Sequence, residues 1–324
     1  MIFDIHSDIF TDVNHRRLRG ESRVFNQYHQ DRLSRGGING GIFVLWVDPP
    51  YDRDPVRRLE EILLNTEKEI LEFQDTAHIV KHFDDIQWAL DNHVMPIILG
   101  LEGMSGLGTD IQGIYRFYDL GLRHASLTWN EANAFATGVG SNEKRGLTPL
   151  GQEMIHQMET LGILLDVSHL NEKSFWDVIR VAQKPVIASH SNARALCDVP
   201  RNLTDDQIRA IAQSGGLVGV NAYHEFIDGN PEWRHLDRYV DHIEHIISLV
   251  GMDHVALGFD FIDYLQEETR QSFSRTRNRS TQGLEDASKA YDVIGKLQAR
   301  GYRDTDIQKI THLNIFRVLK SVIL

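Results

Sequence analysis

The sequence predicts an α/β fold, a (β/α)8 TIM-like barrel, from three observations. Eight short apolar runs rich in β-branched residues recur along the chain, and helical patterns separate them. The chain has 324 residues, of which 41% are hydrophobic and 25% charged, enough for one large core. No linker rich in Pro, Gly or Ser divides it, so we expect one barrel domain over residues 1–324. A doubly wound open sheet is the alternative arrangement of the same elements.

The expected strands and helix starts alternate in chain order. The strands cover residues 2–5, 41–47, 95–101, 124–128, 163–167, 186–188, 217–221 and 255–258. Three helices between them have clear start signals. Thr148 precedes Pro149, which suits a first helical turn, and Asn171 and Thr204 precede acidic first turns. Apolar residues at helical spacing continue from Asn171 to position 183.

Two of these strands end in the same way. The run 163–167 is followed by Ser168-His169, and the run 186–188 by Ser189-His190. A strand, a helix and a second strand form a right-handed crossover with parallel strands. His169 and His190 are therefore expected to emerge together at the carboxyl edge of one sheet. Two imidazoles at such an edge indicate a metal site.

Four more polar residues fall at strand ends. His6 and Asp8 close the first strand, where residues two apart point to the same face about 7 Å from each other. Glu102 ends the third strand between glycines, and Asp260 follows the eighth. In a barrel the carboxyl ends of all strands meet at one rim. These side chains should therefore lie beside His169 and His190, although a polar pair can also simply satisfy a strand end.

The residue types at the rim suit two divalent ions, and mixed imidazole and carboxylate ligands favour Zn²⁺. We expect His6, Asp8 and one Glu102 oxygen to hold the first ion. The other Glu102 oxygen, His169 and His190 would hold the second. Ions about 3.5–4 Å apart can share one bridging water and deliver it as hydroxide. Asp260 would then shuttle the proton from this water to the leaving group, or alternatively orient a metal-bound histidine.

Composition excludes several other classes of function. The formal net charge of −12 disfavours nucleic acid and anionic membranes as partners, because both select for basic surfaces. The single cysteine, Cys197, rules out an internal disulfide and a Cys-x-x-Cys zinc site. The first residues have no basic stretch followed by a long apolar run, and no segment approaches about 18 apolar residues. We therefore expect a cytoplasmic protein.

Several motifs together resemble the membrane (renal) dipeptidase family of zinc peptidases, in the amidohydrolase superfamily, and within it the bacterial branch. These motifs are residues 4–8, 101–103, 146–151, 165–169, 186–194, 200–203 and 254–261, spread over nearly the whole chain. The resemblance implies a barrel of the metal-dependent hydrolase type and a binuclear zinc centre with Glu102 bridging. It also implies that Asp260 is the catalytic acid and base.

The resemblance further implies a role for Arg201 and leaves one position changed. Arg201 would bind the C-terminal carboxylate of a dipeptide, since a guanidinium forks onto a carboxylate; taken alone, an arginine is more often a surface ion pair. Animal members have a histidine near the scissile carbonyl in a Thr-His-Asn segment, where this chain has Thr128-Trp129-Asn130. We expect Trp129 and Asn130 to line the substrate site, with Asn130 as a donor.

The expected activity is thus zinc-dependent hydrolysis of dipeptides that have a free C-terminal carboxylate, a D-residue at that end included. A metal-bridging hydroxide would attack the peptide bond. One alternative is an amidohydrolase acting on N-acyl amino acids or lactones, which a reshaped pocket at Trp129 favours. Another is a non-catalytic metal-binding or ligand-binding protein. The expected partner is the small-molecule substrate, and a homodimer is left open.

Two polar stretches lie outside this set of residues. His242 and His245 fall on one side of a helix expected over residues 236–250, and we interpret them as solvated positions of its surface. Residues 266–282 follow the last strand at the same rim and contain four arginines, Arg270, Arg275, Arg277 and Arg279. This segment is either a lid over the site or a solvated loop.

Overall fold

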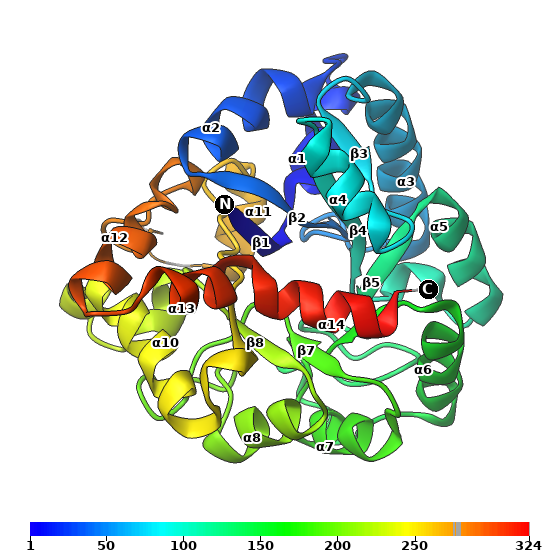
Figure 1. The fold of residues 1–324 in the computed structure, drawn as a ribbon. Coiled ribbons are helices and arrows are strands. Elements are labelled where there is room, and N and C mark those ends of the chain that lie inside the picture. The colour runs from blue at the N-terminus through cyan, green and yellow to red at the C-terminus, as the bar shows by residue number, and fades with distance from the viewer. Residues whose placement is uncertain (275, 277–279, 324) are drawn as a thin grey trace.

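The computed structural model describes residues 1–274, 276 and 280–323 and contains a ring of parallel strands surrounded by helices (Figure 1). The ring strands are β1 (Ile2–Ser7), β2 (Ile38–Trp46), β4 (Met95–Glu102), β5 (Leu122–Ser126), β6 (Leu164–Asp166), β7 (Val186–Ala188), β8 (Leu217–Val220) and β9 (Val255–Leu257). Each pairs in parallel with the next in chain order. All eight expected strands are confirmed. The (β/α)8 barrel is confirmed as well, and the open doubly wound sheet is wrong.

The ring closes where β9 returns to β1. The backbone N–H of Phe259 donates to the carboxylate of Asp4 at 3.0 Å, and the N–H of Asp260 donates to the carbonyl of His6 at 3.3 Å. These contacts bring the first and last strands together at the rim. Two of the expected site residues, His6 and Asp260, are therefore neighbours because of barrel closure.

One further strand was not expected from the sequence. β3 (Ala77–Ile79) pairs with the amino end of β4 outside the ring order. It has three residues with His78 in the middle, so it gives no apolar run of the length that identifies a strand. It extends the sheet edge below the barrel and places no residue at the rim.

The helices follow the strands around the outside of the ring (Figure 1). They are α1 (Ile9–Leu18), α2 (Gln30–Arg35), α3 (Pro55–Glu72), α4 (Asp84–Asp91), α5 (Ile114–Leu120), α6 (Pro149–Leu161), α7 (Glu172–Val181), α8 (Asp205–Gln213), α9 (His224–Ile227), α10 (Leu236–Val250), α11 (Glu267–Phe273), α12 (Asp292–Ala299), α13 (Asp304–Gln308) and α14 (Asn314–Val322). The expected caps are confirmed, because Thr148, Asn171 and Thr204 each accept a hydrogen bond from a first-turn N–H. Within the described residues no helix has the length and apolar composition that a bilayer span requires.

The expectation of a solvated His242 is wrong. Its side chain is fully buried on the inner face of α10, where Nδ1 accepts from the N–H of Ala193 at 3.2 Å and Nε2 donates to the carbonyl of Ile227 at 2.8 Å. A neutral imidazole can satisfy both ring nitrogens in this way without water. His245 is partly exposed and contacts Asp205 at 2.8 Å.

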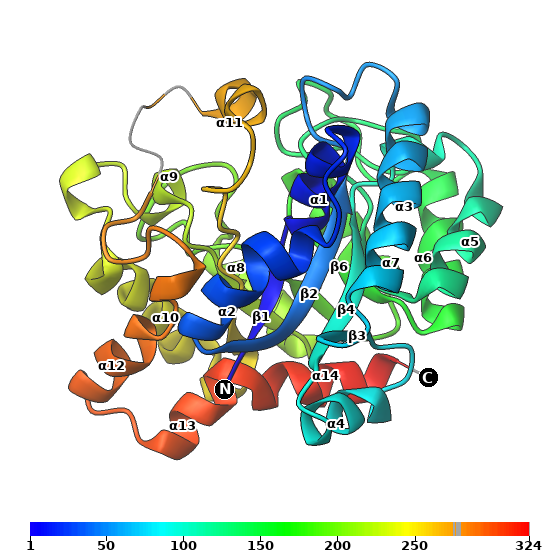
Figure 2. The same ribbon diagram turned by 90° about the horizontal axis from the view of Figure 1, so that it is seen from above.

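The amino end of the barrel is covered by α14 (Figure 2) and is filled with apolar side chains. The interior cluster contains Phe3, Ile5, Ile42, Val44, Ile98, Leu164, Ile187, Leu217 and Ala256, joined by Ile315, Val318, Leu319 and Val322 of α14. The ring of Phe316 meets that of Phe3 edge-on at 5.2 Å. The polar strand ends lie at the opposite end, so the site has a dry, rigid floor.

Gly258 lies at a close approach of two backbones just below this rim. A methyl group added there would lie 1.8 Å from the carbonyl oxygen of Ser189, and no side-chain rotation could relieve that clash. We expect Gly258→Ala to lower the free energy of unfolding by about 1–3 kcal/mol, measured by urea denaturation. Gly295→Ala is the matched control, because its methyl group meets nothing within 4 Å on α12. An equal destabilisation by both variants would contradict this reason.

Candidate metal centre

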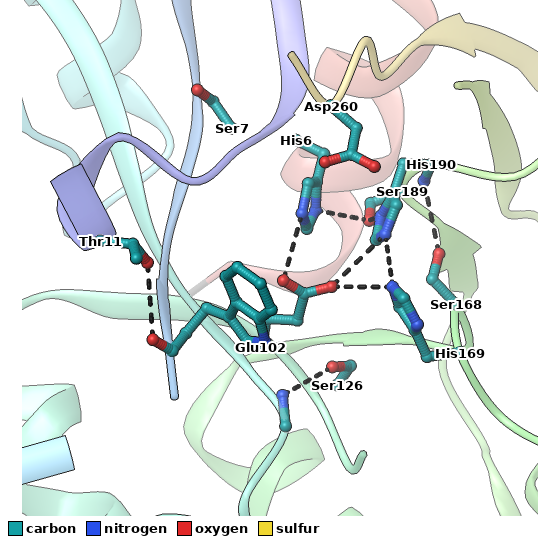
Figure 3. Close-up of polar contacts among 12 residues, drawn as sticks. His6, Ser7, Thr11, Glu102, Ser126, Ser168, His169, Ser189, His190 and Asp260 are labelled. Carbon is teal, nitrogen blue, oxygen red and sulfur yellow. Dashed lines mark hydrogen bonds and ion pairs between the residues drawn. The ribbon is translucent and has the colours of Figure 1, made fainter. Parts of the chain in front are cut away.

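The expected site residues come together at the carboxyl rim, as Figure 3 shows for His6, Glu102, His169, His190 and Asp260. His6 lies in β1 and Glu102 is the last residue of β4. His169 and His190 follow the ends of β6 and β7, and Asp260 follows β9. His6, Glu102, His169 and His190 are buried, with an exposed fraction of 4% for Glu102 and 8% for His169, and Asp260 is partly exposed. Five strands distant in sequence therefore supply one compact polar cluster.

Glu102 lies at the centre of this cluster and divides it into two halves. Its Oε2 faces Nε2 of His6 at 3.5 Å. Its Oε1 faces Nε2 of His169 at 2.9 Å and Nε2 of His190 at 3.4 Å. The two histidine Nε2 atoms are themselves 2.8 Å apart. One carboxylate thus has a separate set of imidazoles on each of its oxygens, the division that the sequence predicts.

Asp8 reaches the cluster by a different route from the one expected. It does not continue the alternation of β1, because the register of β1 shifts between Asp4 and Ser7 and Asp8 is the N-cap residue of α1. The turn into α1 brings its carboxylate to His6 and Asp260, and single ligand atoms of these three residues lie within 4.8 Å of one another. His6, Glu102 and His190 form a second such group. The structure thus brings Asp8 to the cluster through the turn into α1, and not through the strand alternation that the sequence suggests.

Two cluster residues have an unusual backbone conformation. His169 has φ of 67° and Asp260 has φ of 57°, in the left-handed region that non-glycine residues rarely adopt. Such conformations cost of order 1–3 kcal/mol and persist where the surroundings hold them. Both side chains are consequently aimed by turns that the fold maintains against this strain.

Charges in the cluster are strongly shifted by burial and by each other. Burial opposes a charge on His6, but the facing carboxylates, led by Glu102, outweigh it and raise the pKa of His6 to about 10. Burial lowers the pKa of His169 to about 4 and that of His190 well below its usual range. Burial also raises the pKa of Asp260 to about 6. His169 and His190 are therefore neutral at neutral pH, whereas the carboxylates favour a positive charge at His6, which a metal ion beside Nε2 would supply in place of the ring proton.

Two contacts, one from Asn130 to His169 and one from Ser189 to His190, determine which nitrogen of each ring carries a proton. Nδ1 of His169 lies 2.9 Å from Oδ1 of Asn130, an acceptor. Nδ1 of His190 lies 2.7 Å from Oγ of Ser189. When both Nδ1 atoms donate, both Nε2 atoms present lone pairs. The sequence suggests Asn130 as a hydrogen-bond donor to the substrate. In the structure its side-chain oxygen accepts a hydrogen bond from His169.

The donor set fits divalent metal ions. With both Nε2 atoms unprotonated, three acceptors face each other: the two nitrogens and Oε1 of Glu102. In addition, Nε2 of His6 and Oδ1 of Asp8 are buried, and no described residue gives either a hydrogen bond. Buried acceptors without donors are costly unless a cation neutralises them. Imidazole and carboxylate ligands together are the set that zinc commonly takes.

Asp166 and Ser189 support the cluster from below and were not expected as site residues. Asp166 accepts from the N–H groups of Ser168 and Ser189 at 2.9 and 3.0 Å, and its other oxygen meets the Ser189 hydroxyl. Asn221 was also missed; its Nδ2 donates to Oδ2 of Asp260 at 2.9 Å. The sequence marks these three residues only as polar residues that lie inside or at the end of apolar strand runs.

Arg201 is a buried cation beside the cluster. Its side chain is 7% exposed, and Nη1 and Nη2 each donate at 2.7 Å, to Oγ of Ser191 and to the carbonyl of His190. Its Nε is buried, and no described residue accepts from it. Burial lowers the pKa of Arg201 to about 10, so it keeps its charge at neutral pH. The alternative of a surface ion pair is therefore wrong.

A cavity of about 340 Å³ opens over the cluster. Its polar wall contains Asp8, Glu102, Asn130, His169, Arg201 and Asp260. Its apolar wall is formed by Trp46, Trp129 and Phe273, whose ring centroids lie 5.1 to 6.4 Å apart. Trp129 therefore lines the cavity, as expected. A volume of this size suits a small molecule with one charged end and apolar side chains.

Part of the segment 266–282 borders this cavity. Phe273 is the last residue of α11 and forms part of the cavity wall. Thr269 of the same helix donates to the buried Asp48 at 2.8 Å. This anchor ties α11 to the region that follows β2. The positions Arg275, Arg277 and Arg279 lie outside the described residues.

Known proteins resemble this chain in sequence and in fold. The family model for membrane dipeptidases (peptidase family M19) matches residues 1–323. An uncharacterised Klebsiella pneumoniae protein from the pqqA 5′ region is 38% identical, over 74% of this chain and 86% of its own length. An uncharacterised dipeptidase of Schizosaccharomyces pombe is 29% identical, over 96% and 75%. A Rhodobacter sphaeroides metallopeptidase, solved with a phosphinate mimic of the dipeptide L-Ala-D-Ala, has a TM-score of 0.85 at 24% identity and covers 99% of both chains.

Proposed function

Since the chain belongs to the membrane dipeptidase family, peptidase family M19, and is a metal-dependent dipeptidase, we propose that it uses two zinc ions to hydrolyse dipeptides with a free C-terminal carboxylate. Dipeptides with a D-residue at that end are among the proposed substrates. The observation that carries this proposal is the Glu102 carboxylate, with one oxygen towards His6 and the other towards His169 and His190.

The proposed ligands divide as the two oxygens of Glu102 do. One ion would be held by His6, Asp8 and Oε2 of Glu102. The other ion would be held by Oε1 of Glu102, His169 and His190. The unpartnered Nε2 of His6 and Oδ1 of Asp8 support the first set. The facing Nε2 atoms of the two later histidines support the second. Bound zinc supplies Lewis-acid polarisation of the scissile carbonyl and lowers the pKa of water.

Asp260 is the proposed proton carrier. Asn221 donates to its Oδ2, which leaves Oδ1 to accept a proton from water and return it to the leaving amine. Burial raises the pKa of Asp260 to about 6, which brings it near the pH at which a group can both take and give a proton. The position of Asp260 in the cavity wall, beside Asp8 and His6, supports this role.

Arg201 is the proposed site for the substrate carboxylate. It is the buried cation of the cavity wall, and its Nε–H has no acceptor among the described residues. A charged carboxylate placed there would receive a charge-assisted hydrogen bond. The bound dipeptide mimic of the Rhodobacter sphaeroides structure ends in a D-residue, and the similar fold supports the same class of substrate for this chain.

The replacement Arg201→Met tests this role. We expect kcat/KM for dipeptides with a free carboxylate to fall by about 100-fold, because a charge-assisted hydrogen bond to a buried ion is lost, at about 2–3 kcal/mol. Steady-state assays of a dipeptide and its C-terminal amide measure the effect. The amide, already a poor substrate, should change little.

Arg194→Met is the matched control for Arg201→Met. Arg194 lies in the same loop, but its guanidinium binds the carbonyls of Asn202 and Pro200 and does not line the cavity. Its replacement should leave the preference for a free carboxylate intact. If Arg201→Met lowered activity on the acid and the amide equally, the assignment to the carboxylate would fail.

One alternative substrate class is favoured by a specific observation. Trp129 forms an aromatic wall with Trp46 and Phe273, and such a wall would also accept the acyl chain of an N-acyl amino acid or a lactone. The deciding experiment is metal analysis of the purified protein followed by assays on one panel. That panel holds dipeptides with L- or D-residues at the second position, N-acyl amino acids and lactones. Bound zinc without turnover of any dipeptide would contradict the proposal.

A further inference from the structure

Ser189 has three polar contacts through one buried hydroxyl. Its Oγ lies 3.1 Å from Nδ1 of His6, 2.7 Å from Nδ1 of His190 and 2.5 Å from Oδ2 of Asp166. The side chain is fully buried, so no water competes for these positions. The rings of His6 and His190 are tilted by 31° to each other with centroids 3.6 Å apart, and both contact Ser189 (Figure 3).

Hydrogen-bond chemistry allows one arrangement of protons for these contacts. A serine hydroxyl has one proton to donate and two lone pairs to accept with. Asp166 can only accept while ionised, and the hydrogen bonds that it receives from His124, Ser189 and Ser168 outweigh burial and hold the pKa of its carboxyl well below the usual range. The Ser189 proton therefore goes to Asp166. Both lone pairs of Oγ then remain for the Nδ1–H groups of His6 and His190.

This arrangement orients one ligand of each proposed zinc ion. With Nδ1 protonated on both rings, the Nε2 lone pair of His6 points to the side of Oε2 of Glu102, and that of His190 to the side of Oε1. We propose that Ser189 is a positioning residue shared by both metal positions, anchored by Asp166, so that its loss weakens the binding of both ions. This inference rests on the proposed two-zinc function and deepens it.

Asn130 provides a contrast within the same site. Within the part of the chain that the structure describes, its Oδ1 contacts one ligand ring, through Nδ1 of His169, and His169 belongs to the Oε1 side of Glu102. Loss of Asn130 should therefore weaken one zinc ion, whereas loss of Ser189 should weaken two. Asp166 fixes the Ser189 hydroxyl in place because two backbone N–H groups, of Ser168 and Ser189, hold its other oxygen.

Zinc titration of three variants tests the inference. In Ser189→Ala we expect both zinc dissociation constants to rise by about 10–100-fold, the usual effect of losing a partner of a ligating histidine. In Asn130→Ala only one should rise. Ser168→Ala is the matched control: Ser168 also precedes a proposed ligand and is buried, but among the described residues its hydroxyl contacts the backbone N–H of His190, at 3.3 Å, and no ligand ring. That variant should bind both ions as the wild type does.

Two measurements separate positioning from a general loss of structure. The visible spectrum of the Co²⁺-loaded protein should change for both ions in Ser189→Ala and for one in Asn130→Ala. The metal-free Ser189→Ala and Ser168→Ala proteins should each unfold in one cooperative urea transition, as the metal-free wild type does. Ser189→Cys is the second variant if alanine prevents folding, because it keeps the volume but offers only a weak acceptor, and it should again weaken both ions.

The outcomes distinguish this inference from the function on which it rests. A wild type that binds two zinc ions, with Ser189→Ala and Ser189→Cys weakening one ion or neither, overturns the shared role of Ser189 and leaves the proposed function standing. A wild type that does not bind two zinc ions overturns both.

Discussion

Asp260→Asn is expected to keep two zinc ions per chain and to lose dipeptide hydrolysis by about 10³-fold or more. General acid–base groups typically raise the reaction rate by 10² to 10⁴-fold, and Asp260 is proposed to act twice in each turnover. An amide at this position is nearly the same size and keeps a partner for Asn221, but it cannot carry the proton. Steady-state assays on a dipeptide, with zinc analysis of the same sample, measure both parts.

Asp263→Asn is the matched control for Asp260→Asn. Asp263 lies three residues further along the same loop, and its carboxylate is paired with Arg32 at 2.5 Å. We expect it to keep near-normal turnover. If Asp260→Asn instead lost zinc in proportion to activity, Asp260 would be a residue that orients a metal-bound histidine. Full activity in Asp260→Asn would remove it from the reaction altogether.

Glu102→Gln is expected to lower zinc below one ion per chain and to abolish activity. Removal of one charge from a buried set of paired charges costs about 3–5 kcal/mol, which corresponds to roughly 10² to 10⁴-fold weaker binding. Both ions should be affected, because the two oxygens of Glu102 face different histidines. Zinc analysis after dialysis, together with thermal unfolding at several zinc concentrations, measures the loss.

The unfolding measurement gives a second readout for Glu102. A ligand that binds only the folded state at 1,000 times its dissociation constant adds about 4 kcal/mol of stability, so zinc should raise the wild-type midpoint and leave that of Glu102→Gln nearly unchanged. Glu131→Gln is the control, because Glu131 is another carboxylate close enough to feel Glu102 and is not a proposed ligand. A variant Glu102→Gln that still bound two ions would contradict the central place of Glu102.

The sequence was sufficient to predict the ring of the barrel because each ring strand is buried on both faces. Such strands read as continuous apolar runs, and their alternation with helices predicts parallel pairing. β3 was missed because it has three residues around His78 and lies outside the ring. Its pairing with β4 depends on tertiary contacts that local apolar patterning does not encode.

The rim residues could be predicted, and the contacts beneath them could not. His6, Glu102, His169 and His190 follow or end apolar runs, so topology alone brings them together. Asp8 reaches the cluster because it is the N-cap residue of α1, and the alternation of side chains along a strand does not predict such a turn. Ser189 was read only as part of a repeated motif. Its role depends on the distance and direction from its hydroxyl to two imidazole rings, and the spacing of residues along the chain does not specify these.

Closure of the barrel between β9 and β1 has a consequence for biosynthesis. His6 is synthesised 254 residues before Asp260 (260 − 6), whose backbone N–H meets its carbonyl. All five proposed ligands have been synthesised by residue 190, but the contact that joins His6 to the far end of the ring forms only after β9 is made. A chain that has not yet closed its ring should therefore hold the cations less tightly than the finished barrel.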